Sequence, residues 1–308
     1  MNILKYRYVP YALSSLLILF ALFNIVRFGF SLSTEFTGGS ELTFKSSLSV
    51  GDVNKNLDQS LDYEFKLRTQ DDIYVFTTNK DLSENEVENL RNILNKDPNF
   101  VEENLSVVKA VIGQELIYKT FIAVGISILV IFVFIAYSFK SVLASSSAIL
   151  AMIHDTLILL GLFAFFGEVA TAKIDLLFVT ALLTVLSFSL YDTIVIFDRV
   201  RENYKKTSGG YYEVLNLSVR QTMVRSINNS ITSILALYSL ALFVSGSLFW
   251  FALALLIGVV LGTYSSPMVA VPIFYDLQRL TKKLPKKYKR KKPNKKKKKK
   301  EHKDKVVV

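Results

Sequence analysis

The sequence predicts an α-helical membrane protein with six transmembrane helices and one α+β domain between the first and second of them. Three observations predict this class. Hydrophobic residues make up 51% of the 308 residues, and the mean hydropathy of +0.35 is too high for an ordinary soluble enzyme. Several apolar stretches reach the roughly twenty residues that a helix needs to cross a bilayer. Charge is segregated, because an acidic segment follows the first apolar stretch and a basic tail ends the chain.

The apolar stretches define the predicted transmembrane helices. The first follows a basic flank at Lys5 and Arg7, and its length and the lack of a clean small-residue cleavage site argue against a cleaved signal peptide. The predicted spans are residues 9–25, 117–137, 142–166, 174–197, 226–244 and 249–274.

These spans divide the chain into four predicted parts. Residues 1–30 hold the N-terminus and the first helix, and residues 31–116 form the α+β domain. Residues 117–275 contain helices two to six, with a loop at 198–225. Residues 276–308 are so rich in lysine that we expect a disordered polybasic tail.

Strand and helix patterns alternate within residues 31–116. Predicted strands cover 41–44, 63–67, 73–77 and 100–108, and predicted helices cover 52–61 and 84–94. A capping box at 83–86 opens the second of these helices. The order β-α-β-β-α-β predicts a ferredoxin-like sandwich.

The distribution of charge predicts the orientation. Residues 31–117 carry 8 Lys and Arg against 16 Asp and Glu, whereas the chain from Asp276 onward carries 17 against 3. Basic segments remain on the cytoplasmic side of a membrane. Six spans place the N-terminus, the turn at Lys140, the 198–225 loop and the tail on one side. We therefore expect both termini to be cytoplasmic and the α+β domain to be extracytoplasmic.

Composition excludes several kinds of site. The chain has no cysteine and only two histidines, His154 and His302, which excludes disulfides, thiolate nucleophiles and Cys-rich or His-rich metal sites. We expect no cofactor, no metal and no hydrolase or transferase activity. The basic tail is predicted to bind anionic lipid, although ribosomal RNA or an acidic protein could bind the same positive charge. Without interleaved aromatic residues, we expect no specific recognition of nucleic acid.

Four ionisable residues lie in or at the edge of the apolar stretches: His154, Asp155, Asp192 and Arg225. A carboxylate in lipid is costly unless it is paired, protonated or in a wet cavity. Asp192 lies roughly 8 Å inside the predicted end of the fourth span, and Arg225 at the start of the fifth is long enough to reach it. We predict that Asp192 and Arg225 act together as a proton relay, with a static ion pair as the alternative.

Other polar and small residues accompany these four. Asn228, Asn229 and Thr232 follow Arg225 at helical spacing, and this polar stripe must face protein or water. His154 and Asp155 also belong to the predicted relay, but neighbouring side chains point about 100° apart on a helix and cannot both face one cavity directly. A structural role for that pair therefore remains open. Gly258 and Gly262 indicate close helix packing.

Five motifs identify a resemblance that extends to about residue 278. They are EFTGG at 35–39, GQEL at 113–116, HD at 154–155, YDTIVIFDRVREN at 191–203 and FALALLIGVVLGTYSS at 251–266. Together they resemble the SecD/SecF family of protein-export membrane proteins, within the resistance-nodulation-division superfamily. Glu35 and Tyr191 depart from the family pattern, which usually has aspartate and asparagine there.

The resemblance implies a SecF-type chain that pairs with SecD in the bacterial cytoplasmic membrane. It implies use of the proton-motive force to assist late steps of translocation through the SecYEG channel, after the ATPase SecA has acted. In the family, the residues matching Asp192 and Arg225 carry the proton-coupled step. YajC, YidC and the translocating polypeptide are further implied partners. The sequence leaves sodium open as the coupling ion.

Two other functions are compatible with the residues. The chain could be half of an efflux transporter of the same superfamily, although so small an outer domain leaves little room for a substrate channel. It could also be a non-transporting scaffold that tethers the translocon to lipid or ribosomes through its tail. In that case Asp192 and Arg225 would be dispensable.

Overall fold

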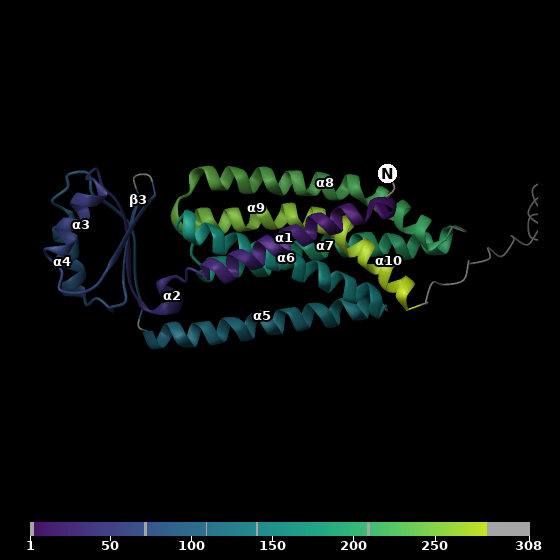
Figure 1. Ribbon diagram of the computed structural model, residues 1–308, viewed down its shortest axis with the longest axis horizontal. Coiled ribbons are helices and arrows are strands. Elements are labelled where there is room, and N and C mark those ends of the chain that lie inside the picture. Colours follow the sequence, from purple (N-terminus) through teal and green to yellow (C-terminus); the bar gives the residue numbers. More distant parts are fainter. Residues whose placement is uncertain (1–2, 71–72, 109, 140, 208–209, 282–308) are drawn as a thin grey trace, which may run out of the picture.

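A small α/β domain is joined to one end of a long helix bundle (Figure 1). The computed structural model describes residues 3–70, 73–108, 110–139, 141–207 and 210–281. The predictions for the turn at Lys140 and for the tail from residue 282 onward lie outside these residues. The end of the bundle next to the α/β domain is called the domain end below, and the opposite end is called the distal end.

The α/β domain contains an antiparallel sheet with two helices on one face (Figure 1). Its elements are β1 (Gly39–Lys45), α3 (Val50–Asp58), β2 (Lys66–Gln70), β3 (Ile73–Thr78), α4 (Glu84–Leu94) and β4 (Val101–Val108). The strands lie side by side in the order β2-β3-β1-β4. The order of strands and helices along the chain is the one that the sequence predicts.

Apolar side chains alternate with polar ones along the two central strands, β1 and β3, and the apolar ones form the core of this domain. Leu42 and Phe44 of β1 and Phe76 of β3 are buried against α3 and α4. In a strand, every second side chain points to the same face, so one face of the sheet is apolar and packs on the helices. The other face, which includes Glu41 and Thr43, is turned toward the domain end of the bundle.

The described part of the bundle contains six helices that are long and apolar enough to cross a membrane, as predicted. They are α1 (Tyr8–Phe28), α5 (Ala110–Phe139), α6 (Val142–Val169), α7 (Leu176–Lys206), α8 (Tyr211–Phe243) and the continuous run of α9 (Gly246–Ser265) into α10 (Val271–Leu280). A one-turn helix, α2 (Thr34–Thr37), lies between α1 and β1. The helices α6, α7 and α9 form the centre of the bundle, whereas α5 and α8 flank it (Figure 1).

The segment 198–225 differs from the predicted loop. Helix α7 continues to Lys206 and α8 begins at Tyr211, so both helices extend well past the apolar stretches. The Nδ2 of Asn203 donates a hydrogen bond to the Oγ of Ser218 at 2.9 Å, which joins the two extensions. The first charged residues of this segment therefore lie where the apolar stretch ends, but α7 continues beyond them as a helix.

The last span contains a π-helical turn, which the sequence pattern does not predict. A π-helical turn, Ser266–Ala270, separates α9 from α10 and contains Pro267. Proline lacks an N–H donor and clashes with the preceding turn, so it disturbs the regular hydrogen-bond ladder. Helix α10 then continues to Leu280, so residues 276–280 are helical and do not belong to the predicted disordered tail.

Three glycines allow close contacts between helices of the bundle. A Cβ on Gly161 of α6 would lie 2.3 Å from the Cα of Ala21 on α1. A Cβ on Gly258 of α9 would lie 2.0 Å from a methyl carbon of Val185 on α7. Gly262 also lies against α7, so the packing predicted for Gly258 and Gly262 is confirmed.

Replacing Gly161 by alanine is expected to destabilise the bundle. The added methyl group meets the backbone of α1, and forcing extra atoms into a packed interface costs about 1–3 kcal/mol. We expect a lower thermal unfolding midpoint for purified Gly161→Ala in detergent. Gly125→Ala on α5 is the matched control, because a Cβ there has no other atom within 4 Å. Equal midpoints for the two variants would contradict this packing.

Candidate functional site

Asp192 is a buried carboxylate on α7. Its side chain is 6% exposed, and its Oδ1 accepts a hydrogen bond from the Oγ of Ser226 on α8 at 3.0 Å. Residues 189, 192, 193 and 196 follow helical i, i+3, i+4, i+7 spacing, and all four are buried. The inward face of α7 therefore carries Asp192 at the boundary with α8.

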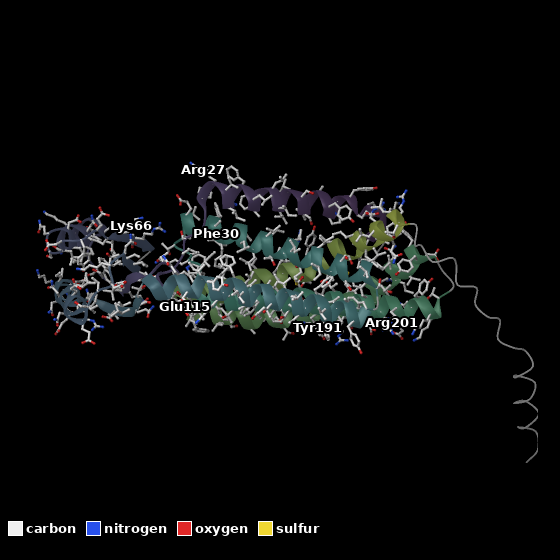
Figure 2. All side chains as sticks on the ribbon, turned by 90° about the horizontal axis from the view of Figure 1, so that it is seen from below. Arg27, Phe30, Lys66, Glu115, Tyr191 and Arg201 are labelled. Atoms are coloured by element: carbon white, nitrogen blue, oxygen red, sulfur yellow. The ribbon has the colours of Figure 1, made fainter. Side chains whose placement is uncertain are left out.

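Arg225 contacts the residue next to Asp192. One of its terminal nitrogens, Nη2, donates a hydrogen bond to the Oη of Tyr191 at 3.0 Å. Tyr191 is 46% exposed and lies on the outside of the bundle (Figure 2). Among the described residues, no ion pair joins Asp192 and Arg225, so the alternative of a static ion pair is not observed and their joint action as a relay stays a prediction.

The geometry of the two helices explains this arrangement. Consecutive side chains on a helix point about 100° apart. Helix α7 therefore presents Tyr191 outward and Asp192 inward, and α8 presents Arg225 outward and Ser226 inward. The outward residues meet each other, as do the inward ones. Arg225 is nevertheless only one residue away from the partner of Asp192, so a change of side-chain rotamer can move its charge toward the carboxylate.

The predicted polar stripe on α8 lies on an exposed face. Asn228, Asn229 and Thr232 are exposed, as is Arg225. The Oγ1 of Thr232 donates to the backbone carbonyl of Asn228 at 3.0 Å, but this bond lies within α8 itself. Lipid cannot satisfy amide and guanidinium groups. This face therefore requires water or a second protein.

A groove of about 350 Å³ lies beside the Asp192 site. Its lining is mainly apolar, but the side chains of Ser226, Ser230 and Thr263 also line it. The hydroxyls of Ser230 and Thr263 share a hydrogen bond. Because Ser226 also donates to Asp192, the groove brings a short line of hydroxyl groups to the carboxylate.

His154 and Asp155 form a second buried cluster, which contacts α7 at Ser189. The Nδ1 of His154 lies 2.9 Å from Oδ1 of Asp155, so these neighbours contact each other directly. The Oδ2 of Asp155 accepts hydrogen bonds from Ser189 of α7 and Ser265 of α9, each at 2.6 Å. The Nε2 of His154 is buried without a hydrogen-bond partner in the described part of the chain. Asp155 therefore links α6, α7 and α9.

Further hydroxyl groups extend this second cluster. Thr193 and Ser266 share a hydrogen bond at 2.8 Å, and Ser266 also donates to the backbone carbonyl of Ser189 at 3.1 Å. The predicted relay residues thus fall into two groups, and α7 belongs to both. Sequence reasoning missed the serines and threonines because such residues are common in membrane helices. Of these, only Ser189 and Thr193 share a helix with one of the two aspartates, Asp192, so only for these two was helical spacing an available signal.

The charged groups of the bundle show no arrangement for a metal. Among the residues that the structure describes, no group of three or more His, Asp and Glu side chains is placed to hold an ion. The chemistry available at Asp192 is therefore that of one carboxylate, one arginine and several neutral hydroxyl groups.

Comparison with known proteins identifies the family. Residues 88–280 match the family described as "Protein export membrane protein SecD/SecF, C-terminal". The chain belongs to the SecD/SecF family. This result confirms the resemblance that the five sequence motifs indicate.

SecD/SecF relatives with the name "Protein translocase subunit SecF" align over most of the chain. The Thermobaculum terrenum protein is 36% identical over 86% of this chain and 90% of its own length. The Sebaldella termitidis protein is 34% identical over 94% of this chain and 95% of its own. The Haemophilus influenzae protein is 31% identical over 89% of this chain and 85% of its own.

Solved structures of SecDF resemble the fold. The SecDF of Thermus thermophilus, described as a translocon-associated membrane protein, superposes with a TM-score of 0.82 at 26% identity over 91% of this chain. SecDF in a super-membrane-facing form gives a TM-score of 0.65 at 26% identity over 92% of this chain. The chain spans only 39% and 40% of those two proteins.

Removal of the Asp155 carboxylate is expected to destabilise the bundle strongly. Asp155→Ala leaves the hydroxyls of Ser189 and Ser265 and the ring of His154 without their shared acceptor, and such a loss costs about 3 kcal/mol or more. The measurement is the thermal unfolding midpoint in detergent. Asp198→Ala, an exposed site on α7, should melt like the unmodified protein. An unchanged midpoint for Asp155→Ala would refute the role of this cluster as a link between helices.

Proposed function

We propose that the chain is a SecF-type subunit that pairs with SecD and assists protein translocation across the bacterial cytoplasmic membrane, driven by the proton-motive force. Family membership and the names of its relatives support the translocation role. One observation carries the coupling role: Asp192 is buried in a membrane-type helix bundle with a neutral serine as its hydrogen-bond partner. In this role the chain is a non-catalytic accessory.

The proposed coupling step is an exchange of partners by Arg225. When Asp192 is protonated, it is neutral, and Arg225 remains on Tyr191. When Asp192 loses its proton, its negative charge attracts the guanidinium, which then leaves Tyr191. Each proton that crosses the membrane releases about 2.3 kcal/mol per 100 mV. The change of partner draws α7 and α8 into a different register.

The exposed polar face of α8 supports pairing with SecD. Asn228, Asn229 and Thr232 are exposed, as is Arg225 beside its bond to Tyr191, and a second membrane subunit would cover this face. The chain also spans only 39% of the Thermus structure, whose name SecDF joins the two subunits.

The same proposal includes the orientation and the remaining partners. We place both termini in the cytoplasm and the α/β domain outside it, where it meets the translocating polypeptide. The strand order β2-β3-β1-β4 supports a ferredoxin-like arrangement for this domain. By family resemblance we add the SecYEG channel with SecA, YajC and YidC, and by its charge the lysine-rich tail binds anionic lipid. No cofactor is required.

The proposed function is tested in cells whose only copy of this chain carries Asp192→Asn. The measurement is the export of a slow-moving secretory protein. Asparagine keeps the size of the side chain but cannot carry a proton, so we expect export to fall to the level of cells that lack the chain. Asp198→Asn is the matched control, because it removes an exposed acid from the same helix.

The amount of assembled complex with SecD is measured in parallel. Normal export by assembled Asp192→Asn would contradict the proposal and favour a scaffold. If a sodium gradient restores export after the proton gradient has been collapsed, the coupling ion is sodium.

A further inference from the structure

The start of α7 is attached to the α/β domain by three sets of contacts. The chain leaves α6, passes along the domain end of the bundle through Lys173 and Ile174, and enters α7 at Leu176. Residues between α1 and β1, and Glu41 of β1 itself, contact this connection at each step. The junction is far from Asp192 in space but belongs to the same helix.

The first contact is a backbone bridge. The N–H of Ser33 donates to the carbonyl of Ile174 at 3.0 Å, and the N–H of Ile174 donates to the carbonyl of Ser31 at 2.8 Å. These bonds form a parallel bridge between Leu32 and Ile174. The strand-like segment that enters the α/β domain is therefore bonded to the one that enters α7.

The second contact caps α7 from outside its own segment. The Oε2 of Glu35 on α2 accepts a hydrogen bond from the backbone N–H of Leu176, the first residue of α7, at 2.8 Å. The Oδ1 of Asp175 accepts from the N–H of Phe178 at 2.7 Å. Helix N-termini have free N–H donors and attract negative charge.

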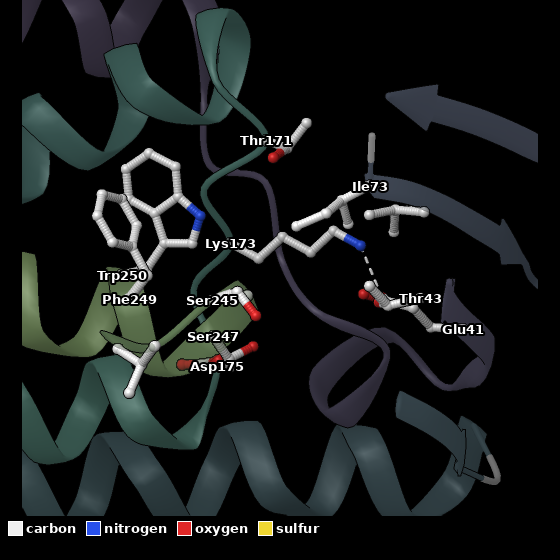
Figure 3. A pocket seen from close by; sticks show the side chains of 13 residues that line it. Glu41, Thr43, Ile73, Thr171, Lys173, Asp175, Ser245, Ser247, Phe249 and Trp250 are labelled. Atoms are coloured by element: carbon white, nitrogen blue, oxygen red, sulfur yellow. Dashed lines mark ion pairs between the residues drawn. The ribbon is translucent and has the colours of Figure 1, made fainter. Parts of the chain in front are cut away.

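The third contact is an ion pair between Lys173 and Glu41 of β1. The Nζ of Lys173 lies 2.6 Å from Oε2 of Glu41, and the two side chains are only 15% and 17% exposed. Figure 3 shows Lys173 reaching from the α6–α7 connection across a pocket of about 300 Å³ toward Glu41. Neither of these two atoms has a further hydrogen-bond partner in the described part of the chain. Rupture of the pair therefore leaves a mostly buried charge uncompensated.

Helix α7 connects this junction to Asp192 without a break. It runs as one helix from Leu176 to Lys206, and at 1.5 Å per residue Asp192 lies roughly 24 Å from its start. A continuous helix of this length transmits a shift along its axis. We infer that Glu35, Glu41 and Lys173 are positioning residues that carry movement of α7 at Asp192 into the α/β domain; this inference rests on the proposed function.

Reversal of the Lys173–Glu41 ion pair tests the inference. The variants are Lys173→Glu, Glu41→Lys and the double swap, each assayed for proton-driven export per assembled complex with SecD. We expect each single variant to lower export by about fivefold or more, and the double swap to restore most of it. A merely structural role would change the amount of complex but not the export rate per complex.

An ion pair within the α/β domain is the matched control. Lys45 of β1 and Glu103 of β4 lie 2.7 Å apart and both belong to the sheet. Lys45→Glu and Glu103→Lys should leave the export rate per complex unchanged. If Lys173→Glu assembles and exports at the normal rate while Asp192→Asn does not, the inference fails and the proposed function stands. If Asp192→Asn exports normally, the proposed function itself fails.

A crosslink gives a second test that does not depend on assembly of the charge variants. The chain has no cysteine, so Glu41→Cys with Lys173→Cys can be joined specifically by a short bismaleimide. We expect the double cysteine variant to export slowly before crosslinking, because it lacks the ion pair, and crosslinking to restore export, because it closes the attachment again. Loss of export on crosslinking would overturn the inference, because it would mean that the contact must open.

Discussion

Polar groups inside an apolar helix bundle must find their partners within the bundle, and this constraint organises the centre of the molecule. Among the residues described, Asp155 has three such partners: His154 on its own helix, Ser189 on α7 and Ser265 on α9. Asp192 has one such partner in the described part of the chain, Ser226 on the neighbouring helix α8. The fully bonded carboxylate links three helices, and the sparsely bonded one is the group to which we assign the proposed proton step.

Helix α7 takes part in both sites because helical geometry gives it two inward faces. Ser189 and Thr193 face the Asp155 cluster, whereas Asp192 faces α8. Gly258 and Gly262 of α9 bring that helix close to α7 and fix it laterally. A helix held by packing on one side and by a switchable acid on the other is suited to small movements along its axis. Its first residue is bonded to Glu35, and this bond is part of the proposed link to the α/β domain.

The large features of the fold were predictable because they depend on local pattern. Six apolar stretches predicted the six long helices of the bundle. The spacing of apolar residues between residues 31 and 116, every second residue in strands and every third or fourth in helices, predicted the order of strands and helices. Asp192 stood out because a lone carboxylate in an apolar stretch is expensive. The family motifs then identified the relatives correctly.

The partners of the site residues were not predictable, because they depend on how two helices are rotated against each other. Arg225 was expected to contact Asp192, but the observed register gives that position to Ser226 and places Arg225 on Tyr191. The extension of α7 through its charged end depends on contacts such as Asn203 with Ser218, which no local pattern indicates. The bond from Glu35 to the start of α7 joins residues 141 positions apart.

The central claim is that the protonation state of Asp192 moves the α/β domain through α7. Distances between spin labels test it directly, with labels at Asn92 on α4 and Tyr238 on α8 in proteoliposomes that contain the complex with SecD. The absence of native cysteine in this chain makes the labelling specific. We expect an imposed proton gradient to shift the distance distribution in the unmodified chain and to leave it unchanged in Asp192→Asn. An equal shift in both proteins would contradict the claim.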